Sequence, residues 1–153
     1  METDKLIGLI SCVSKKKPYP AKAKELYDSP LFIKAKEFAE NKLDKYYILS
    51  AKHGLLDPDE VIDPYDESLK DKDVNARKIW AKNVFEKLVP LLGDNDKIVL
   101  LAGKLYRQFL EELIKKHNIP HSVPLCKYRI GEQLQWYNNV NGNDEYDLDF
   151  ELE

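Results

Sequence analysis

A cluster of polar side chains comes directly after a short apolar run in the middle of the chain. The run, 46–49, has the composition of a buried strand, and Ser50, Lys52 and His53 follow it. Ligands of α/β proteins bind just outside the carboxyl ends of the strands, so a hydroxyl, an ammonium and an imidazole at this position would face a substrate. His53 would exchange protons near neutral pH. The alternative for His53 is a helix cap or a hydrogen-bonded core residue.

The loop that follows carries two carboxylates and a phenol in the segment 63–66, Asp-Pro-Tyr-Asp. Such groups recognise a nucleobase or a sugar, and Tyr65 would offer a stacking plane. Asp66 could stabilise a cationic sugar, as carboxylates do in glycoside cleavage. The alternative is an Asp-Pro turn in which Asp66 is a cap. Glu25, which precedes a predicted helix, could be a general acid/base or could pair with a lysine.

Two further apolar runs, 6–11 and 97–102, end in residues that suit a ligand. After the first run, Cys12 would be a nucleophile if the lysines that follow lowered its pKa, or else a small buried residue. After the second run, Gly103 would let the backbone approach a ligand at the start of a helix. This segment is not a P-loop, because it lacks the Gly-x-x-x-x-Gly-Lys pattern.

The candidate site residues fall into two groups by role. The acid/base candidates are Glu25, His53 and Asp66. The candidates for substrate binding are Ser11, Cys12, Lys15, Tyr27, Ser50, Lys52, Gly54, Tyr65, Gly103, Tyr106 and Gln133. Lysines 15 and 52 are expected to hold phosphate, tyrosine 65 or 106 to stack on a base, and Gln133 to read an amide-like base edge. No metal site is indicated, because no His-x-x-x-His pattern lies near His53 and no Cys-x-x-Cys occurs. No cofactor is indicated either.

The elements that must position these residues alternate between strands and helices. Strands are expected at 6–11, 46–50, 97–102 and 122–125. Amphipathic helices are expected at 31–43 and 73–92, and further helices at 104–116 and 130–138. The alternation predicts an α/β fold, a single three-layer domain with a small, mainly parallel central sheet flanked by helices. Right-handed crossovers would bring Ser11, Ser50 and Ala102 to one edge of that sheet.

Finer expectations concern the loops, the caps and the helix faces. Segments 12–29 and 51–69 are expected to be loops, apart from one helical turn at 21–26. Ser29 before Pro30 is a typical helix start. The helix at 73–92 is expected to bury Ile79, Trp80, Val84, Leu88 and Leu91. The domain would span 1–140, and the acidic tail 141–153 would be flexible.

Composition limits the class of protein. The chain has 153 residues, 43% of them hydrophobic and 33% charged, which is ordinary for a globular domain. No apolar run approaches the ~20 residues that span a bilayer, and the acidic N-terminus does not resemble a signal peptide, so no membrane partner and a cytoplasmic location are expected. A formal net charge of −3 argues neither for nor against nucleic acid. The segment 15–24 is rich in lysine and could meet phosphate.

Several motifs recur together and carry a resemblance. They are Ser11-Cys12-x-Ser14-Lys15, Ala23-Lys24-x-Leu26-Tyr27-x-Ser29-Pro30-Leu31-Phe32, Leu49-Ser50-Ala51-Lys52-His53-Gly54-Leu55-Leu56, Pro64-Tyr65-Asp66, Leu101-Ala102-Gly103-x-x-Tyr106, and Pro124-Leu125 with Ile130-Gly131-x-Gln133-Leu134. This ordered set, with its SxKHGLL and PYD motifs, resembles a family of small bacterial and phage proteins of unknown function, up to about residue 137. The first two blocks are also similar to the core domain of archaeosine synthase, which acts on a deazaguanine base in tRNA. In this chain Lys16-Lys17-Pro18-Tyr19 replaces the Cys-Ser-x-Lys-Pro-Tyr run of that domain. The second resemblance implies an α/β core related to the uracil-DNA-glycosylase group.

These observations favour an enzyme that processes a nucleobase or nucleotide, acting on an N-glycosidic bond or a modified base in nucleic acid. One alternative is a non-catalytic nucleic-acid-binding module, which would bind with a salt-dependent affinity and release no product. Another is a hydrolase or transferase of small nucleotides. The placement of the basic residues discriminates between them, because a continuous basic stripe favours a polymer and a closed pocket with one or two lysines favours a mononucleotide. No oligomeric state is specified.

Overall fold

A five-stranded sheet forms the centre of the molecule. The computed structural model describes residues 5–11 and 15–141. The strand order is β4-β3-β1-β6-β7. The strands are β1 (Leu6–Ser11), β3 (Lys45–Ser50), β4 (Gly54–Leu56), β6 (Lys97–Leu101) and β7 (His121–Ser122). All pairs are parallel except β3 with β4, so the predicted mainly parallel sheet is confirmed.

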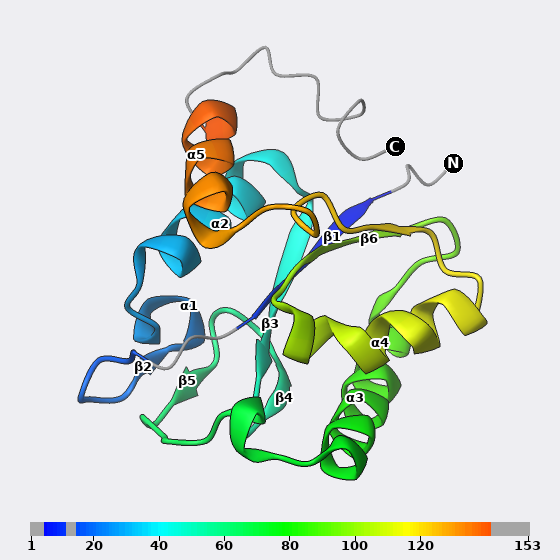
Figure 1. The fold of residues 1–153 in the computed structure, drawn as a ribbon, viewed down its shortest axis with the longest axis horizontal. Helices are drawn as coiled ribbons and strands as arrows, with labels where there is room; N and C mark the ends of the chain where they lie inside the picture. Colours follow the sequence, from blue (N-terminus) through cyan, green and yellow to red (C-terminus); the bar gives the residue numbers. More distant parts are fainter. Residues whose placement is uncertain (1–4, 12–14, 142–153) are drawn as a thin grey trace.

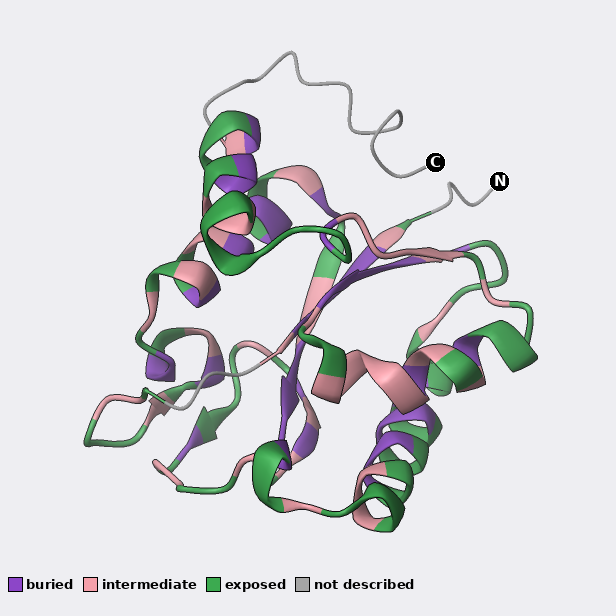
Figure 2. Cartoon of the chain, in the orientation of Figure 1, coloured by how far each residue is buried: buried purple, intermediate pink, exposed green. Residues whose placement is uncertain are grey.

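Helices cover both faces of this sheet and complete the three predicted layers (Figure 1). The long helices are α2 (Pro30–Lys42), α3 (Val74–Leu88), α4 (Lys104–Lys116) and α5 (Ile130–Asn141). Helices α2 and α5 pack on one face, and α3 and α4 on the other. Alternate residues of a strand point into the hydrophobic cores on opposite faces of the sheet. Ile10 belongs to the core under α2 and α5, and Leu9 to the core under α3 and α4. Figure 2 shows the buried strands between the inner faces of the helices.

The helix boundaries follow local rules. The Ser29 hydroxyl accepts a hydrogen bond from the Phe32 N–H (3.2 Å), which confirms the predicted cap of α2. Asp73 caps α3 in the same way. Helix α4 begins after Gly103 without a side-chain cap.

Two residues expected on the inner side of α3 are exposed, so that part of the prediction is wrong. Ile79 is 61% exposed and Leu91 is 46% exposed. The face that packs on the sheet consists of Trp80, Ala81, Val84, Phe85 and Leu88. Ile79 lies one residue, about 100° of helix rotation, before this stripe. Leu91 belongs to a separate 3₁₀ turn (Val89–Leu91) and does not continue the stripe.

Both predicted loops contain short elements. The segment 12–29 holds β2 (Ala21–Lys22) and α1 (Ala23–Leu26), and the segment 51–69 holds β4, β5 (Val61–Ile62) and the start of a 3₁₀ turn (Leu69–Asp71). Strands β2 and β5 pair with each other as a small antiparallel sheet. The acidic segment 142–153 lies outside the described residues. Among the residues that are described, none of the helices has the length and apolar character that crossing a membrane requires.

The connections define a switch point between β1 and β6. These neighbouring strands are parallel, but the chain leaves β1 toward α2 on one face and leaves β6 toward α4 on the other. A crevice opens at the carboxyl ends of two strands whose connections diverge in this way, and it is where open α/β sheets bind ligands.

Candidate functional site

A cavity of about 390 Å³ occupies this switch point, and we call it the switch-point cavity. Its floor is formed by the ends of β1 and β6, and its walls by α2, α4, α5 and the segment before α5. The residues that line it are Ile10, Ser11, Leu31, Phe32, Ala35, Leu100, Leu101, Ala102, Gly103, Lys104, Arg107, Val123, Leu125, Cys126, Tyr128, Ile130, Gln133 and Tyr137. Three of the predicted binding residues, Ser11, Gly103 and Gln133, are therefore brought together here.

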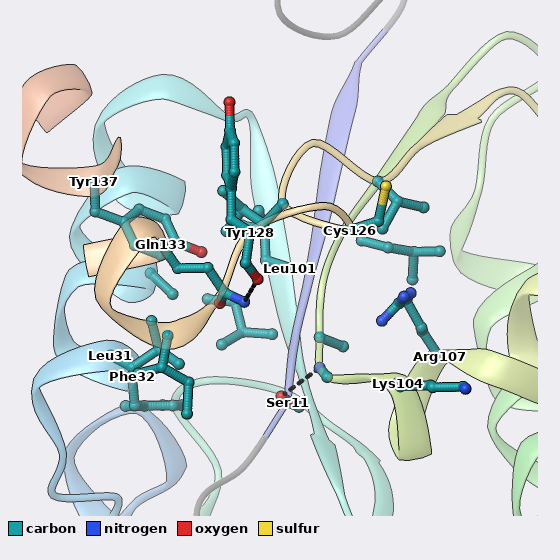
Figure 3. A pocket seen from close by; sticks show the side chains of 18 residues that line it. Ser11, Leu31, Phe32, Leu101, Lys104, Arg107, Cys126, Tyr128, Gln133 and Tyr137 are labelled. Atoms are coloured by element: carbon teal, nitrogen blue, oxygen red, sulfur yellow. Dashed lines mark hydrogen bonds between the residues drawn. The ribbon is translucent and has the colours of Figure 1, made fainter. Parts of the chain in front are cut away.

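The cavity has two chemically different sides (Figure 3). On one side lie Leu31 and Phe32 of α2 with Gln133 of α5. On the other side lie Lys104 and Arg107 of α4. A ligand that fills the space would thus present an apolar, hydrogen-bonding part to the first side and an anionic part to the second.

The cationic side is built on the first turn of α4. Gly103 donates its N–H to the Ser11 hydroxyl (3.3 Å), which joins the ends of β6 and β1. No side chain caps the helix, so its positive end is open to an anion. Within the described part of the chain, the side chains of Lys104 and Arg107 form no ion pair or hydrogen bond. Two cations without an ion pair among the described residues, beside a helix N-terminus, give this side the chemistry that suits an anion.

The apolar side contains one oriented polar group. Gln133 donates a hydrogen bond from Nε2 to the carbonyl oxygen of Tyr128 (3.0 Å). Its backbone N–H bonds to the carbonyl oxygen of Arg129 (2.8 Å), which fixes the first turn of α5. Burial raises the pKa of Tyr137, which lines the same side, well above its usual range. This phenol therefore stays neutral.

A hydroxyl cluster of Tyr27, Ser50 and Tyr65 lies at the end of β3, next to β1. The Tyr65 hydroxyl is 2.5 Å from the Tyr27 hydroxyl and 2.7 Å from the Ser50 hydroxyl. Ser50 is completely buried, and its hydroxyl accepts the N–H of His53 (3.1 Å). The Ser50 carbonyl accepts the indole N–H of Trp80 (2.9 Å), so β3 is tied to α3 at this point.

Aromatic contacts surround this cluster and connect it to the cavity. The Lys16 ammonium is 4.4 Å from the centre of the Tyr65 ring, and the His53 ring meets that ring edge-on at 5.4 Å. The Tyr27 ring contacts Phe32 (5.1 Å between centres), and Phe32 lines the cavity. Lys16 reaches the cluster because its segment forms a bridge with Tyr27.

The acid/base candidates are not brought together by the fold. His53 adjoins the hydroxyl cluster, whereas Glu25 on α1 and Asp66 after β5 are exposed. None of the three lines the switch-point cavity. Among the described residues, no group of His, Cys, Asp or Glu side chains is arranged to hold a metal ion.

The remaining candidates occupy other places. Lys52, His53 and Gly54 line a separate groove with Trp80. Gly54 has a φ of 74° at the turn from β3 to β4, a conformation that favours glycine. Lys15 is exposed, Tyr106 packs edge-on against Trp80 (5.6 Å), and Cys12 lies outside the described residues.

Sequence reasoning missed several residues of the cavity. Lys104 and Arg107 could have been predicted as a cationic pair, because residues three apart share one face of a helix and this helix starts at a strand end. Leu31 and Phe32 belong to a recurring motif, but their types and spacing do not indicate a cavity. They and Tyr128 reach it only through the packing of α2 and the segment before α5 against the sheet.

Comparison with known proteins places the chain in a family. A protein of Bacillus subtilis (strain 168) titled "Uncharacterized protein YfjM" is 32% identical over 131 residues, which cover 79% of this chain and 81% of that relative. No solved structure matches the chain. A family described as "Family of unknown function (DUF6884)" matches residues 7–139. The chain, including the strand ends and helices that form the switch-point cavity, therefore belongs to this family of unknown function.

Proposed function

We propose that this protein is a nucleobase- or nucleotide-processing enzyme that binds its substrate in the switch-point cavity and acts on an N-glycosidic bond. The observation that carries the proposal is the pairing of an apolar side, with Phe32 and Gln133, and a cationic side, with Lys104 and Arg107, in one cavity. A nucleotide has the same polarity, with a flat ring at one end and a phosphate at the other.

The dimensions and charge favour a single nucleotide unit. A volume of about 390 Å³ lies in the range of small-molecule pockets. The two cations of the cavity, Lys104 and Arg107, fit the expectation for a mononucleotide pocket rather than for a basic stripe along a polymer. The substrate is therefore a free nucleotide or one nucleotide extruded from a nucleic acid, since a stacked base would not reach the cavity floor.

Cleavage of an N-glycosidic bond would place specific demands on the groups beside the cavity. The departing base needs a proton, which a positioned side chain can supply. His53 and the hydroxyl cluster do not line the cavity, but the contact between Tyr27 and Phe32 joins the cluster to it. We therefore propose that the substrate extends from the cavity toward this group, and we assign the proton donor to it. The resemblance of the first two sequence blocks to the archaeosine synthase core supports chemistry at a base, and we place this activity in the cytoplasm.

A binding measurement tests the ligand. Isothermal titration of the wild type with nucleoside 5′-monophosphates and with the matching nucleosides should show tighter binding of the monophosphates. Arg107→Ala should weaken monophosphate binding about tenfold or more, because a charge-assisted contact is lost, and should leave nucleoside binding unchanged. Lys115→Ala, at the other end of α4, is the control and should change neither. If Arg107→Ala weakens the binding of monophosphates and nucleosides equally, the phosphate does not bind beside Arg107.

A product measurement tests the reaction. Mass spectrometry of wild-type reactions with monophosphates and oligonucleotides should detect a free base. His53→Ala should reduce the rate of release, at unchanged substrate affinity, about 10²-fold or more if the imidazole donates the proton. If the protein binds both substrate classes but releases no base at any pH, it is a nucleotide-binding module and not an enzyme.

A further inference from the structure

The geometry points to Gln133 as the residue that determines which rings the switch-point cavity accepts. We infer that its Oε1 atom accepts a hydrogen bond from an N–H group of the bound ring, so that rings without such a donor are rejected. The inference rests on the proposed nucleotide site and adds the chemistry of the base to it.

The orientation of the amide follows from its partner. A backbone carbonyl can only accept hydrogen bonds, so the Gln133 atom that faces the Tyr128 carbonyl at 3.0 Å must be the nitrogen. The oxygen and nitrogen of a glutamine are otherwise easily exchanged in a structure, but here the chemistry of the partner fixes them. Because the amide is held in this way, the position of Oε1 is set before any ligand binds.

Oε1 is left as an acceptor on the side of the cavity that holds Leu31, Phe32 and Tyr137. Within the described residues it accepts no hydrogen bond. Figure 3 shows the Gln133 side chain extended between these apolar residues and Tyr128. A ring that displaces water from this side must replace the hydrogen bond that water gave to Oε1, or leave a polar atom unpaired. Sites built to hydrogen-bond a ligand reject analogues that lack the matching group.

The required ligand class is a nucleobase with a ring N–H or an exocyclic amine on the edge that meets Gln133. The second N–H of the amide could donate to a neighbouring carbonyl or ring nitrogen, which makes a lactam edge the best match. An unsubstituted purine has neither an N–H on its six-membered ring nor an exocyclic amine, although it fills nearly the same volume.

Titration calorimetry with three probes tests this inference. Inosine 5′-monophosphate and purine riboside 5′-monophosphate differ in the lactam group, and ribose 5-phosphate lacks a base. The wild type should bind the inosine compound at least tenfold more tightly than the purine compound. Gln133→Leu should reduce this ratio to about one while leaving the affinity for ribose 5-phosphate unchanged. Gln135→Leu is the matched control, because Gln135 is exposed on the same helix and does not line the cavity, and it should keep the wild-type ratio.

The outcomes distinguish a failure of ring recognition by Gln133 from a failure of the nucleotide site itself. If the wild type binds all three probes but does not prefer the inosine compound, or if Gln133→Leu keeps the preference, Gln133 does not read the ring and the nucleotide site stands. If Gln133→Leu weakens ribose 5-phosphate equally, the residue is structural. If no probe binds the wild type, the nucleotide site itself is wrong. Gln133→Met, which is closer in shape, should lose the preference in the same way and separates recognition from misfolding.

Discussion

Tyr65 is the residue on which the hydroxyl cluster depends, because its hydroxyl contacts those of both Tyr27 and Ser50. Tyr65→Phe keeps the ring, with its Lys16 and His53 contacts, and removes only this oxygen. We expect the free energy of unfolding to fall by about 1–2 kcal/mol, the usual cost of losing a partner of buried hydroxyls. Urea unfolding measures the change.

Tyr19→Phe is the control for this prediction. Tyr19 is 55% exposed, and its hydroxyl bonds to no residue in the described part of the chain. Its replacement should leave the free energy of unfolding within about 0.5 kcal/mol of the wild-type value. Equal effects of the two substitutions would mean that the cluster contributes nothing to stability.

Tyr46 makes the free energy of unfolding depend on pH in the alkaline range. Burial, and then the hydrogen bond to Glu40 (2.6 Å), raises the pKa of this phenol well above its usual range. Above the ordinary tyrosine pKa of about 10, the unfolded chain loses this proton while the folded chain keeps it. Unfolding is then favoured, so the free energy of unfolding falls as the pH rises.

Tyr46→Phe should therefore flatten the alkaline part of the stability curve. We expect the loss of unfolding free energy between about pH 9 and about pH 11 to be smaller in Tyr46→Phe than in the wild type, with Tyr19→Phe following the wild type. Urea unfolding at a series of pH values checks this. Tyr137, whose pKa burial also raises, should keep part of the dependence in the variant.

At the residue scale, residue types at the strand ends indicated which polar groups gather there, but they did not indicate which contacts these groups make. Ser50 is a candidate because it ends a strand, and Tyr65 because it is the phenol of the Asp-Pro-Tyr-Asp segment; their hydroxyl oxygens lie 2.7 Å apart. That Tyr65 stacks on a base stays a prediction; the contacts of its ring that the structure adds are Lys16 over the ring and His53 edge-on to it. Such contacts depend on tertiary packing, which residue types and spacing do not specify.

At the element scale, Gly8 in the middle of β1 allows α2 and β3 to approach the strand. A Cβ atom at this position would lie 2.7 Å from Leu43 Cδ1 and 3.3 Å from Tyr46 Cβ. The leucine methyl can move, but the tyrosine Cβ is fixed to the β3 backbone. We expect Gly8→Ala to lower the free energy of unfolding by about 1–3 kcal/mol, as overpacking does.

Gly131→Ala is the matched substitution for this prediction. A Cβ at Gly131, in the first turn of α5, would meet nothing within 4 Å. The free energy of unfolding should therefore stay within about 0.5 kcal/mol of the wild-type value or rise slightly, because alanine favours helix. Denaturation of both variants under the same conditions checks the pair. Similar losses in both would show that the close approach at Gly8 is not what matters.

The elements that could be predicted are those whose pattern is long enough to read. Helix α4 covers Lys104–Lys116, the range expected for a helix that starts after Gly103. Strands β2 and β5 have two residues each and pair across forty positions of the chain, so neither leaves a local pattern. Beside this small sheet, the Lys24 ammonium lowers the pKa of the Asp59 carboxyl, a contact that again only the fold creates.

At the scale of the whole molecule, alternation of strands and helices predicted the parallel sheet, but it did not give the strand order. The ends of β1, β3 and β6 were expected at one edge, and the parallel pairing confirms this. In the observed order, β1 lies between β3 and β6. The switch point is therefore the crevice between β1 and β6. The expected site was the shared edge of the three strand ends, and the cavity occupies the part of that edge formed by β1 and β6, one strand away from His53.

The charge of the whole molecule sets how its ligand affinity responds to salt. With a net charge of −3, most of the surface does not attract a polyanion, and the attraction must come from local cations. If Lys104 and Arg107 alone neutralise phosphate, the logarithm of the association constant for a short single strand should fall with the logarithm of salt concentration with a slope of about −1.4. Fluorescence anisotropy with a labelled oligonucleotide measures this slope.

Arg107→Ala should make the slope less steep by about 0.7, because one phosphate contact is lost, whereas Lys115→Ala should leave it unchanged. A slope several times steeper that persists in Arg107→Ala would show that the lysines of segment 15–24 follow the polymer backbone, and that the cavity holds one unit of a longer bound strand.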